Sequence, residues 1–302
     1  MKLSIVPSLT VIFTGLLIVG VVALVAWRIR TWRAMDRSLT RELETRRRPL
    51  KQLTYDPAET VGLPAPVRRY FEVALCPGQP LVAAVTMEHE GEIDLGGDRP
   101  NWKRFSSFQR VTLSPPGFGW FARVPLVPGV SAEARDVYVG GRGILRVRAM
   151  GIMPLVDIED TEAINKGELM RFLAEGAWYP TALLPSQGVI WDAVDATSAQ
   201  ATLVDGTTRI SLLFRFGPSG LIESVRAEDR PMMEKDGIRP MPWEGRWTGE
   251  IKVDGMRVPR EGEVAWLLPE GRKPYWRGRA TRIRYEFAED PAPFPEGFDS
   301  SG

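Results

Sequence analysis

The stretch Asn165–Pro185, NKGELMRFLAEGAWYPTALLP, is the one strongly helical segment within a long run of strand-like sequence. Asn165 followed by Glu168 has the spacing of a helix N-cap with a reciprocating acid, and Gly176 suits the residue that ends a helix. The apolar residues that recur at helical spacing are Leu169, Phe172, Leu173 and Ala177. A helix over 166–178 with such a face needs a sheet to lie on, so the segment predicts a central, buried helix.

On both sides of this helix the hydrophobic period changes to two. In the run after Leu81, apolar residues such as Val85 and Met87 alternate with polar ones, as in a sheet with one wet face. Gly-containing pairs such as Gly140-Gly141 and Asp254-Gly255 predict short turns, so the sheet should be largely antiparallel. We expect about twelve strands, and sheets of that size rarely stay flat.

The predicted fold class is therefore mainly β (α+β). An N-terminal transmembrane helix is followed by a large curved antiparallel sheet or open barrel of about twelve strands, packed on one central helix. The alternative is two separate sheets, but neither half of the sequence shows a linker-like boundary.

The N-terminus, residues 1–27, is predicted to be a transmembrane anchor. Leu9 to Trp27 is nineteen residues without a charge, or roughly 28 Å of helix, which is enough to cross a hydrocarbon core of about 30 Å. The alternative is a signal peptide cleaved near Ala23 or Ala26. Its apolar region would be unusually long, and its charges would lie on the wrong side.

Residues 28–59 are predicted to be a basic juxtamembrane helix or linker. Residues 28–52 carry nine Arg or Lys against three acidic residues. Because basic residues near a span tend to stay in the cytoplasm, the single-pass protein should place its large domain there, with a periplasmic or extracellular domain as the alternative. The basic residues either attract anionic lipid or serve as a topology signal followed by a solvated linker.

The remaining chain divides into a β-rich domain over 60–287 and a disordered tail over 288–302, which is rich in Pro, Asp, Gly and Ser. The domain should begin with a short amphipathic helix, Leu63–Leu75. From residue 53 onward the net charge is −6. A globally basic nucleic-acid binder is therefore excluded, and no nucleic-acid partner is expected.

The usual catalytic and metal-binding signatures are missing. His89 is the only histidine, which excludes sites needing two, and it lies on the apolar face of a strand, as a core residue would. Cys76 is the only cysteine, so there is no internal disulfide, and it precedes a proline in a loop. We expect no catalytic residue of these types, no metal and no cofactor.

Carboxylates are the remaining chemical option. An acidic cluster is predicted in the loop before the helix, and two more acids, Glu168 and Glu175, fall on the helix opposite its apolar face. Paired carboxylates perform acid/base chemistry or hold divalent cations. The competing interpretation is a solvated loop, with Glu168 as a cap and Glu175 paired with Arg171. The loop acids are Asp157, Glu159, Asp160 and Glu162.

Tryptophan gives the more distinctive signal, because indole rings are spread over most predicted strands and the helix. Indole is large and carries one donor, so it often lines apolar cavities. A curved sheet only partly filled by one helix would leave a hydrophobic pocket for a lipid or other apolar ligand. The competing interpretation is an ordinary aromatic core. The predicted ligand-binding residues are Trp120, Phe172, Trp178, Tyr179, Trp191 and Trp266.

Several sequence blocks resemble an uncharacterised bacterial domain-of-unknown-function family whose members are often single-pass membrane proteins. The resemblance implies no activity and no catalytic residue. The expected architecture is also similar, by analogy only, to the lipoprotein-carrier fold, which would favour a periplasmic domain. The blocks are LPAPVRRYF (63–71), PPGF (115–118), the hairpin at 138–143, GELMRFLAE (167–175), WYPTALLP (178–185) and GEVAW (262–266).

Three functional hypotheses follow. The first is a membrane-anchored β domain, with the lipid bilayer as partner, that binds a lipid or other apolar ligand between its sheet and helix 166–178. The second is a carboxylate-dependent hydrolase or metal-binding enzyme. The third is a protein-interaction scaffold without catalysis, which would expose an apolar patch or a bare strand edge.

Overall fold

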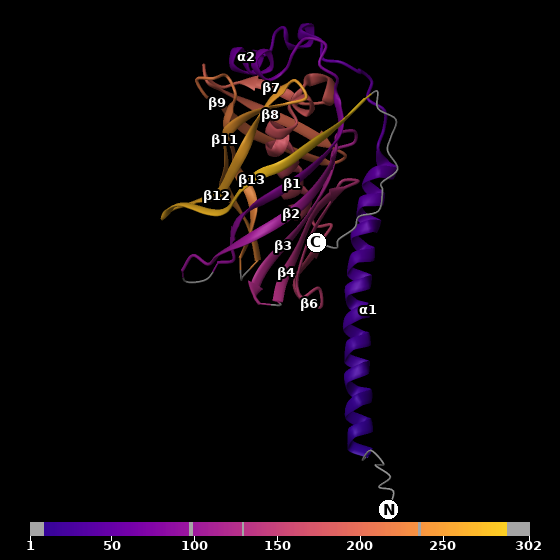
Figure 1. Cartoon of the computed structure of the whole chain (residues 1–302). Coiled ribbons are helices and arrows are strands. Elements are labelled where there is room, and N and C mark those ends of the chain that lie inside the picture. Colours follow the sequence, from indigo (N-terminus) through magenta and orange to yellow (C-terminus); the bar gives the residue numbers. More distant parts are fainter. Residues whose placement is uncertain (1–8, 97–98, 129, 235–236, 289–302) are drawn as a thin grey trace, which may run out of the picture.

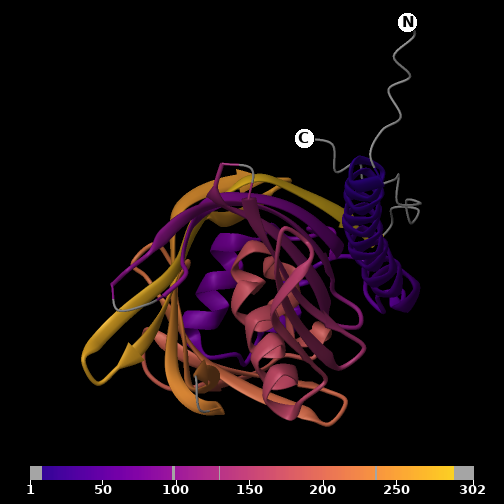
Figure 2. The same cartoon turned by 90° about the horizontal axis from the view of Figure 1, so that it is seen from below.

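The computed structural model describes residues 9–96, 99–128, 130–234 and 237–288. One antiparallel sheet of thirteen strands curls around two helices, and a long N-terminal helix lies along its outer face (Figures 1 and 2). The prediction of a mainly β fold with one curved open sheet is confirmed. Nearly all of the predicted disordered tail, 288–302, lies outside the described residues.

The strand order is β6-β5-β4-β3-β2-β1-β13-β12-β11-β10-β9-β8-β7. β1 pairs with both β2 and β13, so the first and last strands join the two halves into one sheet. The sheet stays open between its edges, β6 and β7. The strands are β1 Val82–Asp94, β2 Trp102–Thr112, β3 Gly117–Val127, β4 Val130–Val139, β5 Arg142–Ala149, β6 Met153–Glu159, β7 Ile190–Ala193, β8 Ser198–Asp205, β9 Thr208–Phe216, β10 Ile222–Glu234, β11 Gly237–Val253, β12 Met256–Leu268 and β13 Gly271–Phe287.

β6 is the strand that the sequence prediction missed. The acidic loop expected there is partly an edge strand paired with β5. Asp157 and Glu159 both bind Arg146 of β5, so these two acids form cross-strand ion pairs rather than a solvated loop.

The long helix α1, Leu9–Arg46, is continuous. By length and composition it is the one described helix that could cross a membrane. The apolar first part of α1 is not buried by the rest of the protein, and we call it the bare part. Its second part is not a solvated linker, because Trp32, Leu39 and Leu43 are buried against the outer face of the sheet.

Ion pairs hold this second part of α1 in place. Arg135 of β4 binds Asp36, and Arg110 of β2 binds Glu44 at 2.6 Å. Arg142 of β5 reaches Glu42 at 3.1 Å. Three strands therefore fix the direction in which the bare part of α1 leaves the domain.

The enclosed helices are α2, Ala65–Ala74, and α3, Glu162–Ala174. α2 confirms the predicted short amphipathic helix and buries Val67, Tyr70 and Phe71. α3 packs against β4, β5, β9 and β10, which connects the two halves of the sheet. Short 3-10 helices complete the inventory: η1 Pro57–Thr60, η2 Glu175–Trp178, η3 Pro180–Leu183 and η4 Pro185–Gln187.

Both predicted ends of the central helix were wrong. The N-cap is Thr161, whose hydroxyl accepts a hydrogen bond from the Ile164 amide at 3.2 Å. Asn165 instead accepts one from the Gly143 amide of β5 at 2.7 Å. Gly176 lies within η2, and a Cβ there would meet Leu183 Cδ2 at 2.5 Å. Its glycine permits close packing rather than a left-handed turn.

Glycines on the inner face give the aromatic side chains room to lie flat against the sheet. Gly91, Gly278 and Gly262 are direct neighbours across β1, β13 and β12. A Cβ on Gly262 would meet the Trp247 ring at 2.5 Å, and one on Gly278 would meet Trp276 at 2.8 Å. Glycines of this kind also allow sharp bending of a sheet.

Candidate ligand cavity

A cavity of about 320 Å³ lies between α3 and the inner face of the sheet. On the helix side it is lined by small residues on one face of α3: Ala163, Gly167 one turn later and Ala174 two turns after that. A Cβ on Gly167 would have only Pro231 Cδ nearby, at 3.9 Å. The cavity exists because this face of α3 lacks bulk. Its aromatic wall consists of Trp120, Trp243, Trp247, Trp266, Tyr275 and Trp276.

The structure separates the six predicted ligand-binding residues into two groups. Trp120 and Trp266 line the cavity, whereas the other four pack elsewhere in the core. Trp178 lies against Trp247 with ring centroids 4.6 Å apart. The other core residues are tied to backbone carbonyls or to one another: Tyr179 donates to Phe172 O at 2.9 Å, and Trp191 donates to Leu183 O at 3.0 Å.

Sequence reasoning missed the remaining aromatic lining, although a signal was present. Strand alternation puts Trp266 and Val264 on one face of β12, and the same rule on β11 and β13 selects Trp243, Trp247 and Trp276. Tyr275 breaks the alternation, because the register shifts where β12 and β13 pair beside it. That shift is not visible in the sequence.

Arg171 organises a buried polar cluster at one side of the cavity. It binds Asp136 of β4, and its Nε donates to Glu175 Oε1 at 2.7 Å. Gln109 donates to the other oxygen of Glu175 at 2.5 Å. Burial alone would lower the pKa of Arg171, but Glu175 and Asp136 raise it, so the guanidinium stays charged. The predicted pairing of Glu175 with Arg171 is confirmed, but this face of the helix is buried rather than solvated.

Glu168 lines the same cavity and is 4% exposed. Burial, followed by repulsion from Asp136, raises the pKa of its carboxyl well above the usual value. It is therefore not the capping acid that the sequence spacing suggested. Its Oε2 has no hydrogen-bond partner among the described residues.

Arg230 is the second cation of the cavity, and a β-bulge directs it inward. On β10 the register shifts between Ala227 and Arg230, opposite Pro242 of β11, which has no N–H to pair. Arg230 is 8% exposed and lies 5.0 Å from the Trp243 ring centroid. Its Nη1 has no hydrogen-bond partner within the described chain.

His89 is buried beside the cavity rather than in its wall. Its Nδ1 lies 3.4 Å from Ser107 Oγ, and its ring packs 5.3 Å from that of Trp178. Burial, with a smaller contribution from Arg171, lowers the pKa of His89 to about 3. The predicted core location is confirmed. Within the described residues, no group of three or more His, Cys, Asp or Glu side chains is arranged to hold a metal ion.

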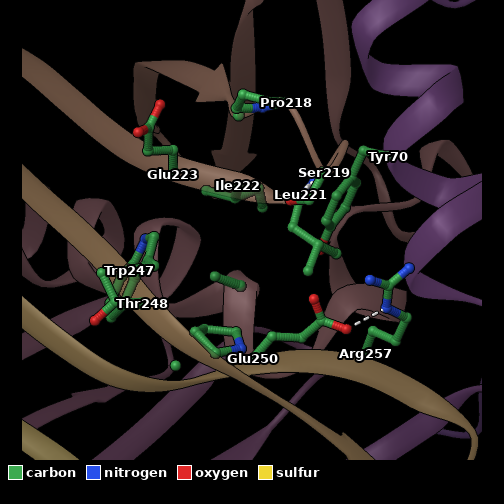
Figure 3. A pocket seen from close by; sticks show the side chains of 14 residues that line it. Tyr70, Pro218, Ser219, Leu221, Ile222, Glu223, Trp247, Thr248, Glu250 and Arg257 are labelled. Atoms are coloured by element: carbon green, nitrogen blue, oxygen red, sulfur yellow. Dashed lines mark hydrogen bonds and ion pairs between the residues drawn. The ribbon is translucent and has the colours of Figure 1, made fainter.

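A smaller cavity of about 210 Å³ lies near α2 (Figure 3). Tyr70, Leu221 and Ile222 line it, and an ion pair between Glu250 and Arg257 borders it. Trp247 contributes to both cavities. We assign the ligand site to the larger of these two cavities, because its aromatic wall is more extensive and because it contains two buried titratable side chains, Glu168 and Arg230, each with one polar atom that has no hydrogen-bond partner among the described residues.

Comparison with known proteins adds a family and several similar structures. A family model described as "Family of unknown function (DUF6920)" matches residues 61–285. None of the curated proteins compared with the chain matches it.

Three solved structures are similar at low identity. A LolA superfamily protein from Nitrosomonas europaea shares 10% identity with a TM-score of 0.39, over 73% of this chain and 92% of that one. A domain of an outer membrane lipoprotein-sorting protein from Vibrio parahaemolyticus shares 6% with a TM-score of 0.36, over 68% and 86%. A β-barrel-like protein of unknown function from Brucella abortus shares 10% with a TM-score of 0.30, over 68% and 99%.

Proposed function

We propose that this chain, which belongs to the family of unknown function DUF6920, is a membrane-anchored protein that holds a lipid or other amphipathic molecule between α3 and the sheet. The cavity is the observation that carries the proposal. Its volume of about 320 Å³ falls at the lower end of the range of small-molecule sites, which is about 300–1,000 Å³. Its wall is largely apolar and includes six aromatic side chains, as expected of a site for an apolar chain.

The polar atoms of the cavity indicate a ligand with one oxygen-rich end. Arg230 can only donate, whereas the hydrogen of a protonated Glu168 is shared with Asp136. The Tyr275 hydroxyl accepts a hydrogen bond from Trp243 Nε1 at 2.9 Å, so its own hydrogen is available. Buried donors of this kind are normally satisfied, and a carboxylate, phosphate or carbonyl group beside Arg230 would satisfy them.

Filling the cavity tests this proposal. We expect Gly167→Leu to abolish binding of the fluorescent apolar probe N-phenyl-1-naphthylamine by the full chain in detergent. Its folding stability should not fall, because glycine is about 0.8–1.0 kcal/mol less favourable than alanine in a helix interior and leucine ranks close to alanine. Gly167→Ala is the matched control, since it adds only one methyl group and should retain most of the binding. Wild-type protein that binds no probe and carries no lipid detectable by mass spectrometry would refute the proposal.

The variant Glu168→Gln distinguishes a structural role of the Glu168 carboxyl from a catalytic role. The raised pKa means that the wild-type protein loses stability as pH rises above about 4.5, by up to about 1.4 kcal/mol per pH unit until the folded pKa is passed. Glutamine keeps the shape and does not ionise. The variant should therefore gain stability relative to wild type between pH 5 and pH 8 in urea unfolding, and it should still bind the probe.

The control for that prediction is Glu162→Gln, at an exposed position in the first turn of the same helix. It should show no such gain. If Glu168→Gln instead shows an unchanged stability profile while abolishing a hydrolytic activity, the carboxylate-enzyme hypothesis is the better one.

We further propose that Leu9–Trp27 spans the membrane and that the charge asymmetry after it keeps the domain in the cytoplasm. Cys76, the only cysteine, is exposed and reports on this topology. A membrane-impermeant maleimide should label it in broken membranes and not in intact spheroplasts. Labelling in intact spheroplasts would place the domain outside the cytoplasm without affecting the proposed ligand.

A further inference from the structure

Large apolar side chains are exposed on four hairpins at one end of the sheet, of which three are neighbours and the fourth, β10–β11, is separated from them by the β12–β13 hairpin. They lie where β1 meets β2, β3 meets β4, β5 meets β6 and β10 meets β11, with exposed fractions between 40% and 60%. The opposite end exposes fewer: the described turns 112–117, 139–142, 216–222 and 253–256 expose none of this size, and the turn between β7 and β8 exposes Val194 at 55%. The residues of this apolar rim are Leu95, Val127, Met150, Met153, Leu155, Met233 and Ile238.

The ligand cavity reaches the same end of the sheet. Met233 and Ile238 belong both to the apolar rim and to the cavity lining. Ile93 and Val147, also in the lining, lie within two residues of the ends of β1 and β5. Figure 2 views the molecule from this end and shows the enclosed helices inside the curl of the sheet. The rim therefore borders the cavity at Met233 and Ile238.

The part of α1 that packs on the sheet determines how far the rim lies from the membrane. Trp32 lies between Arg135 and Arg148, at 3.3 Å and 4.3 Å from the two guanidinium carbons, and Arg148 is the residue before the end of β5. Five residues earlier, or about 7.5 Å along the helix, the uncharged run ends at Trp27. Figure 1 shows the bare part of α1 continuing past the hairpin ends in the same direction.

We infer that the apolar rim rests on the surface of the membrane that α1 enters, so that the mouth of the cavity opens onto lipid. Exposed apolar patches of this kind usually mark an interaction site. We assign the bilayer as the partner of this rim, because the apolar part of α1 leaves the domain at the same end and in the same direction. Exchange of ligand between cavity and bilayer rests on the proposed function, whereas contact between rim and bilayer does not.

Lipid quenching of site-specific fluorophores tests the contact. In the full chain with Cys76→Ser, single cysteines at Val127 and Met153 would be labelled with bimane and placed in phosphatidylcholine nanodiscs. A label at Val61, which is 79% exposed and precedes α2 at the far end of the domain, is the control. We expect phospholipids with a nitroxide at acyl carbon 5 to remove most of the fluorescence at positions 127 and 153 and little at position 61.

Equal quenching at all three positions would overturn the inference. So would labels at 127 and 153 that are shielded from iodide and crosslink between chains, because a second copy would then cover the rim. The paired variant Val127→Asp, Met153→Asp should bind N-phenyl-1-naphthylamine normally in detergent but take it up more slowly from vesicles. Quenched rim labels on a protein that binds no probe would leave the rim inference standing and remove the proposed function.

Discussion

Acidification from pH 6.5 to pH 3 is expected to remove about 4 kcal/mol of the free energy of unfolding through His89 alone. The imidazole is 2% exposed, and burial is the main reason that its pKa falls from 6.5 to about 3. The unfolded chain binds the proton at the higher pH. The contribution of His89 is therefore fully present above pH 6.5 and is lost as pH falls toward 3.

His89→Gln tests this expectation, because His89 is the only histidine and the variant has no imidazole to titrate. The variant should be less stable than wild type at pH 7, where it loses the packing against Trp178. Its further loss between pH 7 and pH 4 should be several kcal/mol smaller in urea unfolding of the full chain in detergent. Carboxylates titrate equally in both proteins, so parallel pH profiles would contradict the expected role of His89.

The second large effect is expected at the base of α1. Arg135 is 4% exposed, forms two hydrogen bonds with Asp36 and covers the Trp32 ring. Burial lowers its pKa, and the pairing with Asp36 opposes that shift. Among the described residues, Asp36→Ala leaves this cation with Glu133, at 3.6 Å, as its one ion-pair partner. Removing one partner of a buried pair costs about 3–5 kcal/mol.

This loss should appear as faster amide hydrogen exchange in residues 32–46 as well as in the unfolding free energy. Glu133→Ala is the matched control, because it removes the more exposed partner of the same arginine and should cost about 1 kcal/mol or less. Equal effects of the two variants would show that Asp36 does not hold α1 on the sheet.

The overall fold followed from the sequence because local signals specified it. Two-residue periodicity with Gly-containing turns gave an antiparallel sheet, and the apolar face of 166–178 gave an enclosed helix. The docking of α1 had a detectable signal as well. Trp32, Leu39 and Leu43 are seven and four residues apart, which places them on one helix face, but the density of charge around them obscured it.

The chemistry of the cavity was less predictable, because it depends on contacts between distant residues. Glu168 and Arg171 look like a solvated helix face until Asp136, 35 residues from Arg171, is placed against them. Arg230 faces inward only because a bulge displaces the alternation of β10, and Pro242 on the partner strand was the one local hint. Trp178 packs against Trp247 whereas Trp276 lines the cavity, a difference that helix or strand position alone does not reveal.

The most direct measurement is a crystal structure of the full chain, grown from lipidic mesophase with a brominated alkanoic acid. An anomalous bromine peak between Gly167 and Trp266, with the carboxylate beside Arg230, is the expected result. A bromine peak confined to the surface, or side chains of α3 and β11–β13 closed over the volume between them, would contradict the existence of a ligand site.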